Sequence, residues 1–344
     1  MRRYAVLCSE KNRENCRLTI LYVVGLSFLL FSVLLGILLG TSSLSPSEIM
    51  RAICEGDFSS TAGRIFLYVR VPRVAASLLC GAALSVAGAV IQGVLANRLA
   101  SPSIIGVNSG AALAVTCATA LGIYGGIRMS LFAFVGAFLT VMAVSLLSRR
   151  FGTRSGTLIL IGVAVNALLG AVSDSIVTFI PDVSVMTLDF RVGDFSSATY
   201  EKVAGIVWLV LISVSLLLMM AKELDVLSLG EDIARGLGMN TTLVRNVFLL
   251  LSAVLSGCAV SCAGLLSFVG LIVPHAIRRI SHTCYFHLLS LCAIWGGGFV
   301  LLCDTLSRTL FSPYEIPVGI IMAFIGAPFF AFILMRGKGA WTDA

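Results

Sequence analysis

The chain has 344 residues, of which 58% are hydrophobic and only 12% are charged, and its mean hydropathy is +1.02. A soluble core cannot use so much apolar surface, so this composition excludes an ordinary soluble protein and indicates a polytopic membrane protein. The net charge of +7 comes from basic residues scattered between apolar runs, a pattern that argues against nucleic-acid binding and for orientation in a lipid bilayer.

The apolar runs predict an all-α protein with ten membrane segments. A basic cytoplasmic tail covers residues 1–18, a single transmembrane domain covers 19–336, and a cytoplasmic tail covers 337–344. The first span lacks a convincing cleavage site, so we expect an uncleaved anchor. The eighth segment contains Pro274 and is barely half a normal span. The spans are expected at 19–40, 74–95, 107–124, 129–147, 157–180, 203–221, 247–267, 268–280, 286–306 and 316–335.

The distribution of basic residues tests this topology. With both termini inside, sixteen of the 24 Lys and Arg residues lie on the cytoplasmic side and eight lie outside. Cytoplasmic loops are normally enriched in Lys and Arg. The bias therefore supports ten segments with cytoplasmic N- and C-termini.

An internal repeat supports the same count. GAALSVAGAVI, beginning at Gly81, matches GCAVSCAGLLS, beginning at Gly257, with an offset of 176 residues. The copies lie in the second and seventh segments, an offset of five, which is odd, so they cross the bilayer in opposite directions. This predicts an inverted repeat of segments 2–5 and 7–10, which in transporters places the pathway between the halves. Chance similarity between Gly- and Ala-rich helices is the alternative, because small residues are common where membrane helices pack.

Three arginines fall on the side where basic residues are disfavoured. Arg70 and Arg73 flank Pro72 before the second span, and Arg308 lies at the outer end of the ninth. Burial of an arginine at the centre of a span costs about 2.5 to 3.5 kcal/mol, so we expect all three at the outer interface. They are either interface anchors or a docking site for an acidic partner.

The polar loop at about 222–243 predicts a short amphipathic helix on the cytoplasmic surface. Ser228 is expected to cap its start, and Gly236 and Gly238 to end it. Its acidic residues suit an anionic leaflet poorly, which favours a protein partner over a helix resting on lipid. The residues expected to transmit motion to that partner are Leu227, Gly230, Glu231, Asp232, Arg235 and Gly238.

The sequence contains few residues in patterns typical of nucleotide binding, catalysis or metal binding. The chain has no GxxxxGK[ST] sequence, no paired carboxylates or Ser/His/Asp arrangement, and no histidine or cysteine spacing typical of a metal site. We therefore expect no enzyme activity, no metal and no cofactor on this chain. Within the spans, only Asp174 and Asp304 are acidic, which is few for an ion-coupled carrier. A secondary carrier with an inverted repeat nevertheless stays open as the alternative.

Seven motifs, in order over about 270 residues, resemble the FecCD-type permeases of ATP-driven importers for iron-siderophores, haem and cobalamin. They are VRVPR (69–73), GAALSVAGAVIQ (81–92), LASPSIIGVNSGA (99–111), LILIGVAVNALL (158–169), LSLGEDIARGLG (227–238), FVGLIVPH (268–275) and EIPVGIIMAFIGAPFF (315–330).

The resemblance implies the type II ABC importer permease fold in a bacterial or archaeal cytoplasmic membrane. It implies a homodimer with ten segments per subunit and a pathway at the two-fold axis. Two ATP-binding subunits would dock inside and use the ATP, and a substrate-binding protein would dock outside. By similarity, Arg70, Arg73 and Arg308 meet acidic residues of the binding protein, and residues 227–238 contact the ATPase.

The resemblance also implies a cytoplasmic gate at Asn97 and Leu99, with a second element at Thr153 and Ser155. The chain departs from the family here, because Asn97-Arg98-Leu99-Ala100 replaces the common Asn-Pro-Leu-Ala. Arg98 would either close the pore or pair with a carboxylate of the ATPase. A second departure is Phe190, which stands where a tryptophan is common.

Overall fold

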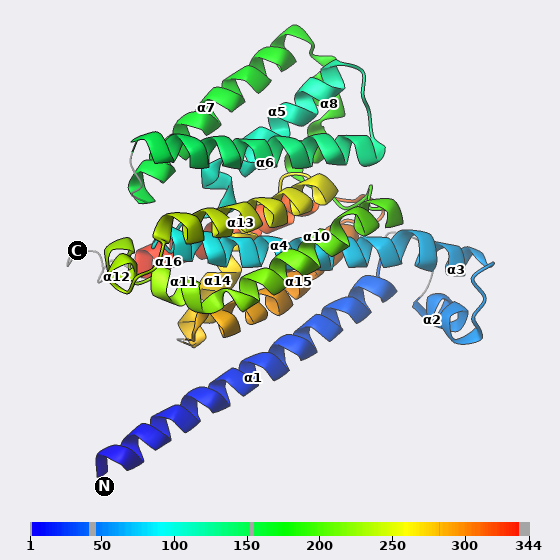
Figure 1. The fold of residues 1–344 in the computed structure, drawn as a ribbon. Helices are drawn as coiled ribbons and strands as arrows, with labels where there is room; N and C mark the ends of the chain where they lie inside the picture. The colour runs from blue at the N-terminus through cyan, green and yellow to red at the C-terminus, as the bar shows by residue number, and fades with distance from the viewer. Residues whose placement is uncertain (1, 41–45, 152–154, 282, 337–344) are drawn as a thin grey trace.

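The computed structural model describes residues 2–40, 46–151, 155–281 and 283–336, and every regular element in these ranges is helical (Figure 1). Seven helical stretches in the described part are long and apolar enough to cross a membrane. They are Cys16–Leu38 in α1 (Arg2–Leu38), Thr61–Val94, Gly126–Ser148 in α6 (Gly126–Phe151), Gly156–Phe179 in α7 (Ser155–Phe179), Tyr200–Met219 as α10, Thr241–Ala263 as α13 and Tyr285–Thr309 as α15.

Three shorter helices lie in the remaining predicted segments, at 107–124, 268–280 and 316–335. They are α5 (Val107–Ala120), α14 (Val269–Ile280) and α16 (Val318–Arg336). Each of the ten predicted segments thus contains one helix, although three are shorter than the seven long stretches. Residues 2–18, expected as a separate tail, continue the helix of α1, and residues 337–344 lie outside the described ranges.

The second segment begins earlier than predicted. It consists of α3 (Thr61–Ile65), the π-helical turn η1 (Phe66–Arg70) and α4 (Val71–Val94) in one continuous stretch. Pro72 lies in the first turn of α4, and the helical stretch that begins at Thr61 continues through it. The proline therefore does not break the entry into the span.

The two ends of the described chain lie on the same side of the molecule in Figure 1. The described N-terminal end of α1, the end of α16 and the short helix α12 (Glu231–Gly236) lie at the left of the view. The helices α2 (Pro46–Glu55) and α3 lie at the right. These two ends correspond to the predicted cytoplasmic and outer sides.

Helix α4 lies at the centre of the molecule, and almost all of its residues are buried. Its glycines permit close backbone contact with two neighbours. A Cβ on Gly81 would lie 2.3 Å from the carbonyl oxygen of Gly296 in α15, and one on Gly88 would lie 2.0 Å from that of Gly270 in α14. Helices approach this closely in membranes where small residues meet, so the small residues of the repeat copy that begins at Gly81 form a packing surface.

The second copy of the repeat, which begins at Gly257 in α13, also packs closely against another helix. Helix α13 runs beside α4 in the opposite direction (Figure 1). A Cβ on its Gly257 would lie 3.1 Å from the ring of Phe134 in α6. Thus α4 packs on α15, the third helix of the second half, while α13 packs on α6, the third helix of the first half.

Candidate functional site

A buried ionic group joins the outer ends of α4 and α15. The Arg73 Nε atom donates to both oxygens of Asp304, at 3.0 and 3.2 Å, and its Nη1 atom lies 2.9 Å from Glu315 Oε2. The Arg308 Nε atom lies 3.2 Å from Asp304 Oδ2. We call Arg73, Asp304, Arg308 and Glu315 the outer cluster. Each arginine of the cluster is paired with a carboxylate, which lowers the free-energy cost of burying its positive charge.

Arg308 of the outer cluster and the neighbouring Arg70 also bind the carbonyl oxygens at the end of α1. Arg308 donates to the carbonyl oxygens of Leu39 and Gly36, both at 3.3 Å, and Arg70 donates to that of Ile37. The last carbonyls of a helix have no partner within it and carry partial negative charge. The two arginines therefore satisfy the outer end of α1 and fix it beside α15.

The three arginines lie at the predicted outer end of the molecule, at the start of α4 and the end of α15, but their side chains are buried there. Arg70, Arg73 and Arg308 are only 2%, 4% and 3% exposed. Arg73 and Arg308 are buried beside Asp304, which sequence reasoning treated as an isolated acid within a span but which lies completely buried between their two guanidinium groups, whereas Arg70 bonds to the end of α1. Their role in docking a binding protein stays a prediction.

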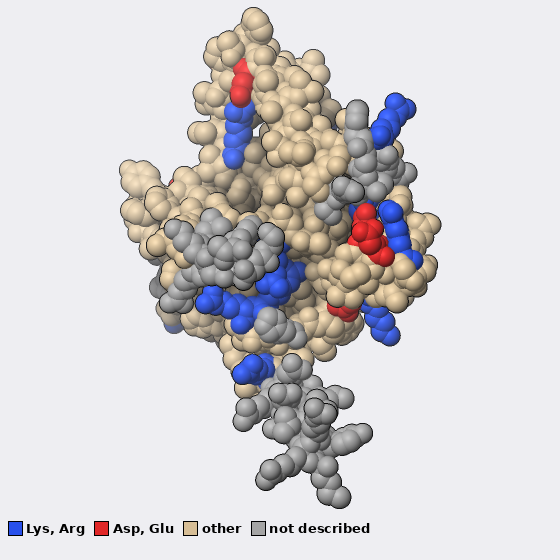
Figure 2. All heavy atoms as spheres, turned by 90° about the vertical axis from the view of Figure 1, so that its left-hand side faces the viewer, with Lys and Arg blue, Asp and Glu red and all other residues tan. Residues whose placement is uncertain are grey.

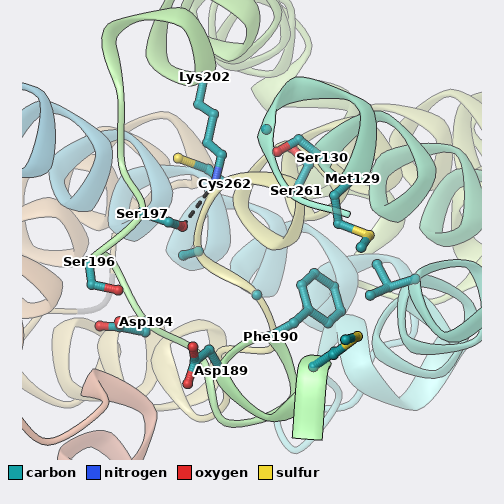
Figure 3. Close-up of a pocket in the computed structure, with 16 residues that line it drawn as sticks. Met129, Ser130, Asp189, Phe190, Asp194, Ser196, Ser197, Lys202, Ser261 and Cys262 are labelled. Carbon is teal, nitrogen blue, oxygen red and sulfur yellow. Dashed lines mark hydrogen bonds between the residues drawn. The ribbon is translucent and has the colours of Figure 1, made fainter. Parts of the chain in front are cut away.

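A pocket of about 230 Å³ opens near this outer end (Figure 3). It lies among α6, α9 (Leu188–Val192), the first turn of α10 and the end of α13. Lys202 points to Ser197, to which its amine donates at 2.9 Å, and Asp189 and Asp194 line the opposite edge. Sequence reasoning did not find this pocket, because its lining comes from six helices, α5, α6, α8 (Asp182–Met186), α9, α10 and α13, and the loops between them. Among the described residues, no group of histidine, cysteine and acidic side chains is arranged to hold a metal ion.

At the other end of the molecule, the predicted amphipathic helix is a pair of short helices, α11 (Ala221–Leu227) and α12. Ser228 does not cap α12; its hydroxyl donates instead to the carbonyl oxygen of Asp225, and Gly230 is the capping residue. Gly230 and Gly238 have φ values of +114° and +83°, which strongly favour glycine. The sharp turns on both sides of α12 therefore depend on these two glycines.

The side chains of this region divide into anchors and exposed groups. Leu227 is buried, and Glu231 pairs with the buried Arg245 of α13 at 2.5 Å and with Arg235 at 3.6 Å. Asp232 points outward. Three large apolar side chains are more than half exposed, namely Leu229, Ile233 and Leu237. We call these three the apolar patch; such a patch on charged, anchored helices is typical of a protein interface.

The predicted gate lies in a tight turn at 96–100, which follows α4 and which we call the gate turn. Ala96 has a positive φ of 47°, and the Asn97 side-chain oxygen accepts from the N–H of Leu99 at 2.9 Å. Arg98 is exposed on the turn. Of the second predicted element, Thr153 lies outside the described residues, and Ser155 is the first residue of α7.

Asn166 of α7 is a positioning residue that sequence reasoning missed. Its side-chain amide donates to the carbonyl oxygens of Ser103 and Ile104, at 3.0 and 3.1 Å, and its oxygen accepts from the Ser109 hydroxyl. Ser103 and Ile104 belong to η2 (Pro102–Ile105), just after the gate turn. The available signal was a lone amide side chain inside an otherwise apolar span.

The comparisons with known proteins agree with this geometry. The FecCD transport family matches residues 28–336. The Fe(3+)-citrate import system permease protein YfmD of Bacillus subtilis is 32% identical, with 96% of this chain and 98% of the relative covered. The vitamin B12 import system permease protein BtuC of Yersinia pseudotuberculosis is 34% identical, with 92% and 93% covered.

A solved structure, described as an inward-facing conformation of a metal-chelate type ABC transporter, superposes with a TM-score of 0.77. The two chains are 29% identical, and the alignment covers 94% of this chain and 99% of the other. The fold, the pair of short helices α11 and α12, and the family match lead to one identification. This chain belongs to the FecCD transport family and is a multi-pass, non-catalytic permease subunit of an ABC transporter.

Proposed function

We propose that this chain is the permease of a type II ABC importer for an iron chelate, haem or a cobalamin-like molecule. It would lie in the cytoplasmic membrane of a bacterium or archaeon with both termini inside. The apolar patch on α12 and its two flanking turns is the observation that carries the proposal, because it offers an anchored, exposed contact for an ATP-binding subunit. The cargo class follows the relatives, one named for ferric citrate and another for vitamin B12.

The proposed transport domain has ten segments, of which α4–α7 and α13–α16 form an inverted repeat. The crossed packing supports this assignment, since α4 packs on α15 and α13 packs on α6. Inverted repeats in transporters allow one half to move against the other around a central pathway.

The partner across the pathway would be a second copy of the chain. Helix α7 is the least buried of the seven long apolar stretches described, and it exposes Leu160, Val163 and Leu168. The same helix holds η2 through Asn166. A homodimer that meets at α7 would therefore link its interface directly to the gate turn. Asn97, Arg98 and Leu99 would form that gate together with Thr153 and Ser155.

A substrate-binding protein would dock at the outer end. Glu315 is the exposed edge of the outer cluster, with one-third of its side chain accessible. Acidic groups of a docked protein would compete with Glu315 and Asp304 for Arg70, Arg73 and Arg308. Because carboxylates bind guanidinium groups strongly in low-dielectric surroundings, docking would rearrange the cluster and transmit a signal along α4 and α15.

Co-purification tests the ATPase contact. The wild-type permease should bring down a subunit with a P-loop motif, identified by mass spectrometry, and Ile233→Asp/Leu237→Asp should lose it. Leu121→Asp/Leu310→Asp, which changes two exposed leucines away from the apolar patch, is the matched control and should retain it. Retention of the subunit by the patch variant, or absence of any P-loop subunit from the wild type, would contradict the proposal.

A further inference from the structure

Four basic side chains converge beside the gate turn. Arg98 from the turn and His275, Arg278 and Arg279 from α14 line a cavity of about 280 Å³, which we call the basic cavity. Figure 2 looks onto the end of the molecule that carries α12, and it shows Lys and Arg side chains gathered on this face. The cavity therefore lies at the proposed cytoplasmic end of the protein.

Arg278 is held rigidly at the inner side of this cavity. Its guanidinium donates to the side-chain oxygen of Gln92, to the Tyr285 hydroxyl at 3.2 Å and to the carbonyl oxygen of Ala89 at 3.5 Å. It also lies 5.5 Å from the centre of the Tyr285 ring, where the ring face attracts a cation. All of these partners are neutral, so they orient the positive charge without cancelling it.

The positive charges of the basic cavity are not neutralised by paired carboxylates of the described chain, unlike those of the outer cluster. Across the described ranges, none of Arg98, His275, Arg278 and Arg279 forms an ion pair with a carboxylate. In the outer cluster, by contrast, Asp304 is shared between two arginines. Several like charges around one cavity repel one another and concentrate anions there.

We propose that the basic cavity is an anion site that takes a phosphate group. Guanidinium groups present paired N–H donors that match phosphate oxygens, and three of them face one cavity here. Its volume suits one phosphate group, not a whole cobalamin. The group can come from free phosphate or from an anionic lipid headgroup, because basic pockets at the cytoplasmic ends of membrane helices recognise such headgroups.

Inorganic phosphate is the first probe. The full-length permease in nanodiscs of phosphatidylcholine is titrated with phosphate by isothermal titration calorimetry. Arg98→Ala/Arg279→Ala should weaken binding by about tenfold or more, since each lost hydrogen bond to a charged group has an effect of this order. Arg51→Ala/Arg64→Ala removes the same charge from two exposed outer residues and should leave binding unchanged.

Phosphatidylglycerol distinguishes the two sources. If the headgroup occupies the cavity, native mass spectrometry will show this lipid retained by the wild type and lost from Arg98→Ala/Arg279→Ala. If the site takes free phosphate, the lipid will not compete with the titration. The proposal is overturned if the two double variants bind both probes equally. Neither assay needs cargo or an ATPase, so the result is independent of the proposed transport function.

Discussion

Replacement of Asp304 by asparagine tests the outer cluster most sharply. The substitution keeps the shape of the side chain and removes only its negative charge. Asp304 is fully buried and lies within 3.2 Å of guanidinium nitrogens from both Arg73 and Arg308. The variant would therefore leave two buried cations with less negative charge beside them: Arg73 would keep Glu315 at 2.9 Å and Asp194 at 3.8 Å, and Arg308 would lose its contact with the Asp304 carboxylate.

The magnitude follows from these contacts. Breaking a buried ion pair by removing one partner costs about 3 to 5 kcal/mol, because the remaining charge is left buried without compensation. Arg73 keeps its contact with Glu315, and Arg308 keeps the carbonyl oxygens at the end of α1. We therefore expect a loss at the lower end of this range, about 3 kcal/mol, which corresponds to roughly 5 to 10 °C in melting temperature.

Thermal unfolding of the detergent-solubilised permease, followed by size-exclusion chromatography, measures the effect. Glu315→Gln is the matched control, since this residue is partly exposed and makes one pairing with the cluster; it should cost less than about 1 kcal/mol. Equal melting temperatures for Asp304→Asn and Glu315→Gln would refute the argument that Asp304 compensates both arginines.

Three further substitutions test other parts of the molecule. Gly88→Ala should destabilise the permease by about 1 to 3 kcal/mol because its Cβ would strike a carbonyl of α14, whereas Gly170→Ala, in open space, should not lower the melting temperature. Asn166→Ala removes two hydrogen bonds to η2 and should speed hydrogen exchange at residues 102–106; unchanged exchange would exclude its positioning role. Glu231→Gln weakens the ion pair with the buried arginine of α13 and should increase exchange in α12, while the exposed Asp232→Asn should not.

The sequence predicts the membrane helices well because their signal is local. Each span is an apolar run, so composition and length are enough to locate it. The start of the second span was predicted too late, at Val74, because the predicted span began only after Arg70, Pro72 and Arg73, whereas the helix already begins at Thr61. The repeat at Gly81 and Gly257 predicted opposite directions for the two helices that carry it. Helices α4 and α13 do run in opposite directions, but their contact with each other was not predicted.

The site was harder to predict because its contacts join distant residues. Arg73 and Asp304 are 231 positions apart, and nothing in either local sequence indicates that they pair. The burial of Arg73 and Arg308 was not predicted for that reason. The gate turn was found only by resemblance, and Asn166 was missed because one amide in an apolar span does not reveal its partner.

ATP-driven uptake measures the central claim directly. The permease is reconstituted into proteoliposomes with its co-purified ATP-binding subunit and binding protein, and uptake of ferric citrate, haem and cobalamin is followed. We expect uptake of one of these cargoes that requires ATP on the side of the ATP-binding subunit and is lost in Ile233→Asp/Leu237→Asp. Uptake driven by an ion gradient in vesicles that contain the permease alone would contradict the assignment and support a secondary carrier.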